Sequence, residues 1–440
     1  MRKRFSYVFY VGLMAILLIS SGVLFAQGVT AVEKPKEPIE LVILSHAVHQ
    51  QTMSGNGGKD LIKEFIETHP NVKSVQFITA GTPQVGDRLF REVALPTTSI
   101  DVAFAYSPWL TPKITNFFIP IEDFTATKPL EDEDDFIDSF FEQVTFNGKR
   151  YGVPMRTSGG SFIFFNKKIL AERGVQPPTT MEELFEAIKA TSFTRANGEK
   201  VYGFVQQGNK AEITYALGGF MRAMDVDLIT TDYKSNLTHP DVIKIVQAFS
   251  DLYKAGALPE NFTALTNADV IALFQDNRAA FTKKDPDYIN RLFKAGSLEK
   301  SDIGYIQFPP QASDLTKWDG VVPQETFQWV MAVPKGSQHK EEAWDFIRFM
   351  SSKDAVINEA LSGNTPPRIS TFADPRYIAK VPYAAEQLEM FKMGRSMFPA
   401  FDNYTEVNDI IGEYMQEAVL GKVSAQDAMK AADARIKPLL

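Results

Sequence analysis

One stretch, Asn147–Lys168, with the sequence NGKRYGVPMRTSGGSFIFFNKK, constrains the fold more than any other part of the chain. It opens with a polar turn and ends in a dense β-type run, Phe162–Phe165. Between these lie Pro154 and the pair Gly159-Gly160, which are unusual in a central strand because proline removes a ladder donor and glycine weakens packing. The stretch is therefore predicted to leave one domain, cross an open region and enter a second buried sheet. A plain hairpin within one domain is the alternative for these residues alone.

Strands and helices are predicted to alternate on both sides of this stretch. Before it, apolar runs at 39–45, 72–79 and 100–106 are typical of strands, and the segments 59–68 and 84–95 have helical spacing. After it, strands are expected at 201–206 and 279–283 and helices at 213–224, 241–255 and 268–275. Such alternation indicates βαβ units, which form sheets with helices on both faces. A chain of 440 residues is long enough for two or three such domains.

Composition and motifs exclude several classes of function. A net charge of −8 and a pI of about 5.4 do not favour nucleic acid as a partner, because such proteins carry a basic face. The chain has no cysteine, which removes thiol catalysis, disulfides and thiolate metal sites. The glycine-rich segment 55–60 lacks the first glycine and the Ser or Thr that a P-loop needs. No Gly-x-Ser-x-Gly elbow supports a hydrolase nucleophile.

Two further patterns could hold a metal ion, and neither is complete. His46 and His49 have the spacing of a metal pair, but no third ligand is evident nearby. The acidic run Glu131–Asp135 is better explained as a solvated helix start than as a calcium site, because acidic residues favour a helix N-terminus. We therefore expect no cofactor, no metal and no enzyme activity.

The N-terminus has the pattern of a secretory signal. Three basic residues, Arg2–Arg4, precede an apolar run that ends near Ala26. We expect residues 1–31 to be a signal peptide, cleaved after Ala26 or Ala31, and residues 32–38 to be a linker. Without cysteine there is no thiol for an N-terminal lipid, so a periplasmic or secreted protein is expected. An uncleaved N-terminal membrane anchor is the alternative.

The stretch that opened this section resembles a segment of a known family, the extracellular solute-binding proteins of bacterial ABC importers, carbohydrate-binding family 1, which includes maltose-binding protein. Gly148–Pro154 and Phe165–Lys167 are similar to the family's "G-K-x-Y-G-V-P … Y-N-K" pattern, the first crossover between two lobes. Further matches in order are Pro177–Leu184, the helix Ala343–Phe349 and Gly363–Arg368, which resembles the third crossover. Met181 stands where the family usually has tryptophan. No carboxylate lies near Gly159, so maltose is not implied as the ligand.

The resemblance implies an α/β fold of the two-lobed, type II periplasmic-binding-protein class. Each lobe would be a mainly parallel sheet flanked by helices, and three crossovers would join the lobes. The expected lobes are 39–154 with 332–362, and 155–331 with 363–440. Such a protein is expected to be a monomer that captures a sugar, oligosaccharide or polyol between its lobes by hinge closure. It would then deliver the solute to the permease subunits of an ABC importer in the membrane.

A carbohydrate site needs aromatic side chains for the apolar ring face and planar polar groups for the hydroxyls. Loops that follow parallel strands line the cleft of open α/β sheets. With the family's pattern, this selects the candidate ligand-binding residues His46, Ser107, Trp109, Arg156, Thr157, Ser158, Gln207, Asp285, Asp287, Trp329, Arg368 and Tyr404. Arg368 matches the arginine of the third crossover, with a structural role as its alternative.

Two other functions stay open from the sequence. One is a secreted carbohydrate-active enzyme, because paired catalytic carboxylates cannot be located without a structure. The other keeps the fold but binds a sugar phosphate or a glycerol phosphoester, with Arg156 and Arg368 as clamps on the anion.

Overall fold

The structure is a computed structural model that describes residues 37–55, 58–317 and 321–440, without the side chains of Pro83 and Asp287. The predicted signal peptide lies outside these residues. The chain from Ile39 to Leu440 forms one compact unit, which contains all the elements named below. Within the described ranges, no helix combines the length and the apolar character that a bilayer crossing requires.

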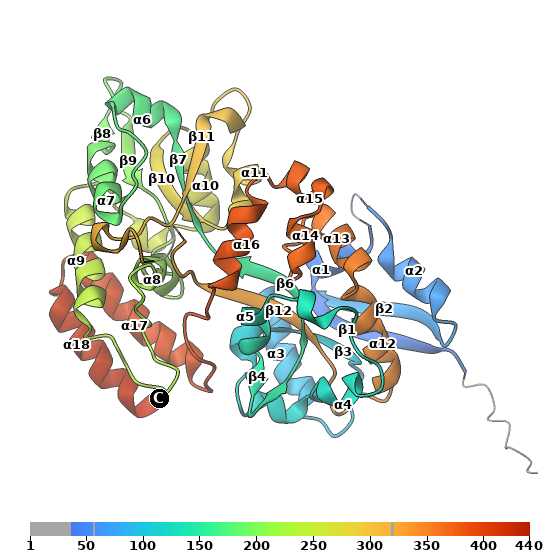
Figure 1. Cartoon of the computed structure of the whole chain (residues 1–440). Coiled ribbons are helices and arrows are strands. Elements are labelled where there is room, and N and C mark those ends of the chain that lie inside the picture. The colour runs from blue at the N-terminus through green and yellow to red at the C-terminus, as the bar shows by residue number, and fades with distance from the viewer. Residues whose placement is uncertain (1–36, 56–57, 318–320) are drawn as a thin grey trace, which may run out of the picture. The chain divides into compact units, whose positions relative to one another are not determined.

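The first of two five-stranded sheets contains, in spatial order, β2 (Val72–Ala80), β1 (Ile39–His46), β3 (Val102–Tyr106), β12 (Thr326–Ala332) and β6 (Val153–Gly159). Around it lie α1 (Ala47–Met53), α2 (Leu61–Thr68), α3 (Thr82–Val93), α4 (Glu122–Thr125), α5 (Asp138–Glu142), α12 (Lys340–Met350) and α13 (Lys353–Leu361). A short hairpin, β4 (Thr145–Phe146) with β5 (Lys149–Arg150), precedes β6. Figure 1 shows this sheet with helices beside it. Apolar side chains of the sheet and its helices form one buried cluster.

Helix α2 shows how the sequence sets this packing. The helix begins after Asp60, whose Oδ1 accepts a hydrogen bond from the backbone N–H of Lys63 at 3.0 Å. Its buried side chains, Leu61 and Phe65, are four residues apart and therefore share one face. The Phe65 ring meets Phe346 of α12 edge-on, with ring centroids 5.2 Å apart. Burying a side chain of this size stabilises the fold by about 1.5–3 kcal/mol.

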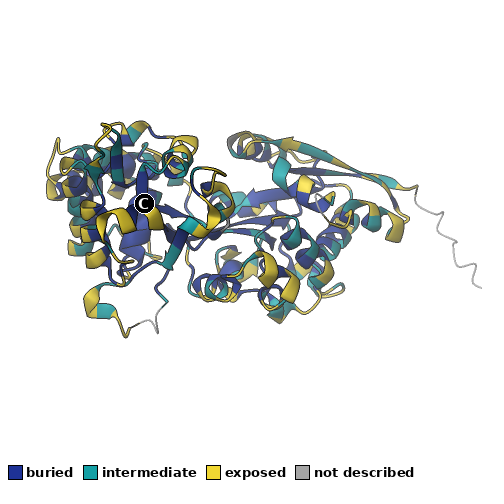
Figure 2. Cartoon of the chain, turned by 90° about the horizontal axis from the view of Figure 1, so that it is seen from above, coloured by how far each residue is buried: buried dark blue, intermediate teal, exposed yellow. Residues whose placement is uncertain are grey.

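The second sheet contains β11 (Ile303–Gln307), β7 (Phe162–Asn166), β10 (Ala279–Lys284), β9 (Lys200–Phe204) and β8 (Phe193–Thr194). The helices that pack on it or follow its strands are α6 (Lys167–Arg173), α7 (Met181–Ala190), α8 (Ile213–Arg222), α9 (Pro240–Lys254), α10 (Asn267–Gln275), α11 (Ile289–Leu292), α17 (Tyr404–Val419) and α18 (Ala425–Ile436). Figure 2 shows the strands of both sheets as mostly buried and the outer helices as partly exposed.

The α/β class with two helix-flanked sheets is confirmed, but the strand directions are more mixed than predicted. In the first sheet β1 is parallel to β2 and β3, whereas β12 is antiparallel to β3 and β6. In the second sheet only β10 and β9 are parallel among the described strands. The physical reason is that β6, β7 and β12 belong to connections between the sheets. They do not return through a helix on the same sheet, so nothing requires them to run parallel.

The segment Asn147–Lys168 does pass from one sheet to the other. Its first part is β6 of the first sheet and its second part is β7 of the second sheet (Figure 1). At Gly160 it meets the segment before β12, because the Gly160 N–H donates to the carbonyl of Glu325 at 2.9 Å. A third segment joins them, since Thr326 N–H donates to the carbonyl of Arg395 at 2.9 Å. These three hydrogen-bonded segments form what we call the junction.

Glycine is required at one position of the junction, and this gives a test. Gly159 has φ of 92°, and a Cβ added there would lie 2.2 Å from the carbonyl oxygen of Glu325. We expect Gly159→Ala to lower the free energy of unfolding by about 3 kcal/mol or more, because backbone strain and overlap add. Gly174→Ala is the matched control, since Gly174 has φ of 66° but open space around it. Strain alone should cost about 1–2 kcal/mol there. Equal losses in chemical denaturation would contradict the clash.

Three further helices follow α13 in the chain: α14 (Ile369–Phe372), α15 (Pro375–Lys380) and α16 (Ala384–Lys392). Their apolar residues form a cluster with Ile137 and Phe140 near α5 and with Ile357 and Ala360 of α13. The segment that follows Gly363–Arg368 thus packs on elements around the first sheet, and its Tyr383 and Met390 also join a cluster with β7 of the second sheet. The lobe boundaries expected from the sequence stay a prediction.

Candidate functional site

A pocket of about 430 Å³, which we call the central pocket, lies where β3, β9 and β10 end. Its first-sheet side consists of Tyr106, Ser158 and Phe327. The other lining residues are Gln206, Gln207, Ala211, Glu212, Tyr215, Asn267, Lys284, Asp285, Tyr288, Met397 and Tyr404. The carboxyl ends of strands are the usual place for ligands in open α/β sheets.

Asp285 is the best-positioned acid of the central pocket. The hydroxyl of Tyr215 donates to its Oδ1 at 2.8 Å, and the backbone N–H of Gly159 donates to its Oδ2 at 3.4 Å. The same Tyr215 hydroxyl lies 3.1 Å from the hydroxyl of Ser161. Asp285 therefore follows β10 of the second sheet, and Gly159 at the end of β6 donates a hydrogen bond to it. Each carboxylate oxygen already accepts one hydrogen bond from the protein.

Lys284 and Glu212 bring opposite charges into the same pocket. The Nζ of Lys284 donates to Oδ1 of Asn267 at 2.7 Å and to Oε1 of Gln207 at 3.4 Å. Burial lowers the pKa of Lys284 to about 8. Burial also raises the pKa of Glu212, and the nearby Lys284 opposes that shift. Among the described residues no hydrogen bond or ion pair occupies the Glu212 carboxylate, so it is available to a ligand.

A buried ion pair lies directly behind the pocket wall. The Nζ of Lys283 is 3.3 Å from Oε2 of Glu325, and the two side chains are only 1% and 3% exposed. Lys283 also donates to the backbone carbonyl of Tyr215 and lies 3.8 Å from the centroid of that ring. Burial lowers the pKa of Lys283 and raises the pKa of Glu325, and each partner opposes the shift of the other. The pair thus fixes the Tyr215 side chain to the junction.

Aromatic rings continue from the central pocket to Trp109. The centroid of Tyr106 is 5.7 Å from that of Trp109 and 5.5 Å from that of Trp329. Trp329 is 6% exposed and stands edge-on to His49, with centroids 5.0 Å apart, so it supports the cluster from within. Tyr106 and Trp109 are half-buried and leave part of their rings open. Such rings can cover the apolar face of a ligand.

Two other pockets share lining residues with the central pocket. The aromatic pocket, of about 450 Å³, is lined by Gly86, Asp87, Phe90, Pro108, Trp109, Thr111, Lys113, Ile114, Phe401, Asp402, Tyr404 and Thr405. The basic pocket, of about 210 Å³, is lined by Arg156, Thr157, Ser158, Gly159, Asp285, Pro286, Tyr288, Arg291, Thr365 and Gln387. Most of the residues that the sequence predicted are in these three pockets: Trp109, Arg156, Thr157, Ser158, Gln207, Asp285 and Tyr404.

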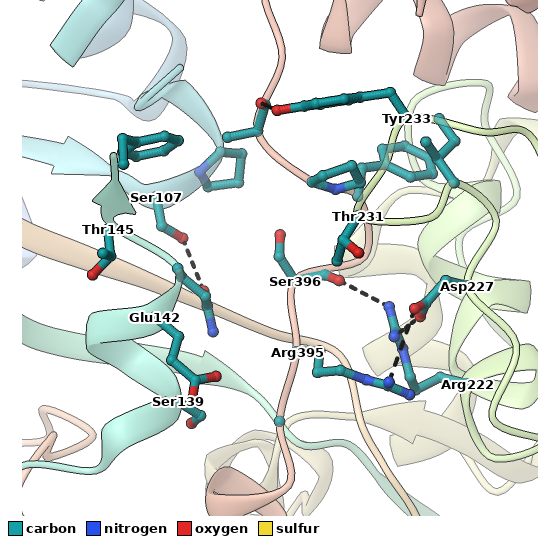
Figure 3. A pocket seen from close by; sticks show the side chains of 18 residues that line it. Ser107, Ser139, Glu142, Thr145, Arg222, Asp227, Thr231, Tyr233, Arg395 and Ser396 are labelled. Carbon is teal, nitrogen blue, oxygen red and sulfur yellow. Dashed lines mark hydrogen bonds and ion pairs between the residues drawn. The ribbon is translucent and has the colours of Figure 1, made fainter. Parts of the chain in front are cut away.

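A further pocket of about 350 Å³, the Arg222 pocket, involves a different set of residues (Figure 3). Ser107 lies here and not in the central pocket, because its Oγ donates to Oε1 of Gln143 at 3.3 Å. Arg222 forms an ion pair with Asp227 and donates to the carbonyl of Ser396 at 2.8 Å (Figure 3). Arg222 and Asp227 are thus used for internal contacts.

Arg368 has a structural role and lines none of the pockets named above. Its side chain is fully buried, with the guanidinium 4.0 Å from the centroid of Phe136. Its N–H groups donate to the carbonyls of Ser351 at 2.8 Å, Asp132 at 2.9 Å and Glu131 at 2.6 Å. This is the alternative that the sequence left open, and it removes Arg368 as an anion clamp.

Three other predicted residues are not placed in the pockets. His46 caps helix α1, since its Nδ1 accepts the N–H of Val48 at 3.2 Å. Trp329 supports the aromatic cluster from behind. Asp287 lies on the short turn Pro286–Tyr288, but its side chain is outside the described part of the structure.

Sequence reasoning missed ten lining residues of the central pocket: Tyr106, Gln206, Ala211, Glu212, Tyr215, Asn267, Lys284, Tyr288, Phe327 and Met397. Tyr106 and Lys284 are the last residues of β3 and β10, so the rule on strand ends could have found them. Glu212 and Tyr215 belong to the start of α8 and carry no local signal of this kind.

The arrangement defines the class of a two-lobed α/β binding protein, with a polar and aromatic site built from both sheets. No group of His, Asp and Glu side chains within the described ranges is arranged to hold a metal ion. Residues 60–385 match the family described as bacterial extracellular solute-binding protein, and the chain belongs to this family.

Similar proteins agree with this membership. A protein of Brucella abortus, named only as a binding protein, is 24% identical over 307 residues, which is 69% of this chain and 71% of the relative. Maltose-bound MalE3 of T. maritima has a TM-score of 0.74 at 23% identity and covers 91% of this chain and 100% of that chain. A ribitol-bound ABC transporter solute-binding protein of Agrobacterium radiobacter has a TM-score of 0.73 at 19% identity, with coverages of 92% and 100%. These structures confirm the fold.

Proposed function

We propose that this protein is the periplasmic receptor of an ABC importer and captures a neutral sugar or polyol in the central pocket. The observation that carries the proposal is the composition of that pocket, where partly open tyrosine rings stand beside carboxylate, amide and ammonium groups. Sugars present apolar ring faces and a rim of hydroxyls, and these side chains complement both. Maltose and ribitol, the ligands of the two similar structures, are neutral polyhydroxyl compounds.

The charges of the central pocket favour a neutral ligand over a phosphorylated one. Glu212 and Asp285 stand in the pocket with the single ammonium group of Lys284. Hydroxyl groups can donate to both carboxylates and accept from Lys284, whereas a phosphate would meet two carboxylates. With Arg368 buried in the fold, one of the two proposed anion clamps is also absent from the site.

Binding is proposed to act through hinge closure. The junction joins the sheets by hydrogen-bonded segments, and a ligand that contacts both sides of the central pocket favours the closed state by its differential affinity. We expect small-angle scattering to give a smaller radius of gyration with ligand than without it. Asp285→Asn at the same ligand concentration is the control, because binding should be weakened there. An unchanged radius of gyration in the saturated protein would contradict closure.

A thermal-shift screen tests the function itself. The chain from residue 32, unfolded and refolded to remove any retained ligand, would be screened against monosaccharides, oligosaccharides, polyols and their phosphates. A ligand at a hundred times its dissociation constant stabilises the fold by about 2.7 kcal/mol, which raises Tm by several degrees. We expect a neutral sugar or polyol to do this without being consumed. Product formation would support the carbohydrate-active enzyme, and stabilisation only by phosphates would support the anion receptor.

Export and partners complete the proposal. Residues 1–31 would direct secretion, and the mature monomer would dock on the permease subunits in the membrane. Mass spectrometry of the protein exported by a Gram-negative host should show a chain that begins at residue 27 or 32. An intact N-terminus in the membrane fraction would show the anchored form.

A further inference from the structure

The central pocket shares lining residues with both of its neighbours. Tyr404 lines both the central and the aromatic pocket. Ser158, Asp285 and Tyr288 line both the central and the basic pocket. All four residues are half-buried.

We propose that the aromatic, central and basic pockets form one groove, and that the solute is a linear oligosaccharide that spans it from Trp109 to Arg291. This inference rests on the proposed function. It replaces the open choice between a monosaccharide, a polyol and an oligosaccharide by the last of these. Proteins of this fold bind both a disaccharide and a polyol, so the fold alone does not set the length of the ligand.

Volume is the first argument for a long ligand. The central pocket, of about 430 Å³, and the aromatic pocket, of about 450 Å³, each exceed the ~300 Å³ at which ordinary small-molecule sites begin. The basic pocket adds about 210 Å³. A single sugar ring or a short polyol would leave most of this space filled with water. It would also leave many of the polar groups that line the space without a contact to the ligand.

The second argument is the sequence of ring surfaces along the groove. Trp109 lies in the aromatic pocket, Tyr404 at its border with the central pocket, Tyr106 and Tyr215 in the central pocket, and Tyr288 at the border with the basic pocket. Each of these residues is half-buried. A chain of sugar rings can contact such surfaces one after another, because every pyranose ring has an apolar face.

Trp109 is also built into position. A Cβ on Gly86 of α3 would lie 3.1 Å from Cζ2 of the indole, so the ring rests closely on this glycine. On its other sides the indole is edge-on to Phe90 and Trp329, with centroids 6.1 and 5.3 Å away. An indole held on three sides offers a rigid surface, and binding to it costs little side-chain entropy.

The opposite end of the groove is polar. Arg291 is exposed and places its guanidinium 4.8 Å from the centroid of Tyr288. Thr157, Thr365 and Gln387 supply hydroxyl and amide groups around it. This end suits the hydroxyl rim of a terminal sugar, whereas the aromatic pocket suits a ring face.

Isothermal titration calorimetry of the refolded chain from residue 32 tests the length of the ligand. The probes are maltose, cellobiose and xylobiose, with their series up to the hexasaccharide, their monosaccharides, and ribitol and mannitol. We expect affinity in at least one series to rise about tenfold or more between the monosaccharide and the tetrasaccharide, and then to level off. A monosaccharide or polyol that binds as tightly as every longer probe would overturn the inference but leave the proposed function intact. Failure of every carbohydrate to bind would overturn both.

Variants at the two ends show whether the whole groove is used. Trp109→Ala and Arg291→Ala should each reduce the ratio of long-chain to short-chain affinity by about twofold to tenfold. Phe293→Ala, at an exposed aromatic residue that lines none of the pockets named above, is the control and should leave the ratio unchanged. Equal weakening of long and short probes by the end variants would show a compact ligand and would overturn the inference. Circular dichroism establishes that each variant is folded.

Discussion

Replacement of Lys283 by methionine is expected to lower the free energy of unfolding by about 3–5 kcal/mol, because it leaves the buried carboxylate of Glu325 without its cation. The Lys283 side chain is 1% exposed and that of Glu325 is 3% exposed, so neither can turn to water. Lys283 also supports Tyr215, which orients Asp285. Ligand affinity should therefore fall together with stability.

Chemical denaturation checks this result, and the chain offers two controls. Lys294→Met removes a lysine that is paired with Asp276 at 2.7 Å but is 53% exposed, and it should cost about 0–1 kcal/mol. The double variant Lys283→Met/Glu325→Leu removes both buried charges and should recover most of the lost stability. If the single and double variants are equally unstable, the buried charge is not the cause.

The pH dependence of the Lys283→Met variant follows from the sign of the Glu325 shift. Burial raises the pKa of Glu325 above its ordinary value of 4.5, and loss of Lys283 removes the largest opposing effect. A carboxyl whose pKa is raised in the folded state contributes stability below the unfolded pKa, and this is lost as pH rises through the folded pKa. The difference in the free energy of unfolding between the wild type and the Lys283→Met variant should thus be smaller near pH 4.5 than at pH 8.

Replacement of Asp285 by asparagine should weaken ligand binding by about 10- to 100-fold. The carboxylate lines both the central and the basic pocket, and hydrogen bonds to a charged group contribute about 1.5–3 kcal/mol. Stability should change less, because the asparagine carbonyl can still accept from the Tyr215 hydroxyl. Calorimetry with the ligand found by the thermal-shift screen measures the effect.

Tyr215→Phe separates positioning from direct contact. It removes the hydroxyl that donates to Asp285 at 2.8 Å, and we expect a loss of about fivefold to tenfold in affinity. In the double variant with Asp285→Asn the two losses should not add, because the residues share one hydrogen bond. Asp276→Asn changes an exposed acid outside the groove and is the control. Full affinity in Asp285→Asn would place the site elsewhere.

The sequence predicted the passage between the sheets better than the residues of the site. Pro154 and the Gly159-Gly160 pair have backbone consequences that are local, so the crossover could be inferred without knowing what surrounds it. Asp285 and Gln207 were predicted as residues of second-lobe loops that commonly face the ligand in the family, and both line the central pocket. For the crossover, the chemistry of a few neighbouring residues was sufficient.

Where the sequence failed, the cause was the direction of a side chain or a contact from a distant part of the chain. Arg368 stands in the expected segment, but its guanidinium turns inward to backbone carbonyls near residue 132, which no local pattern reveals. His46 is the last residue of β1, one residue beyond the predicted strand 39–45, and its ring caps the next helix. Glu212 and Tyr215 reach the site only because α8 packs beside the strands of the second sheet.

The junction has a consequence for what happens when the backbone is cut. Because its three segments are hydrogen-bonded to one another at Gly160, Glu325 and Arg395, each is held by its neighbours as well as by its own peptide bonds. A protease that cleaves one of them would leave the two halves associated through the other two. The nicked protein would then migrate as one particle in native buffer and separate into fragments only in denaturant. For the same reason, a circular permutant with its chain ends at such a nick should still fold.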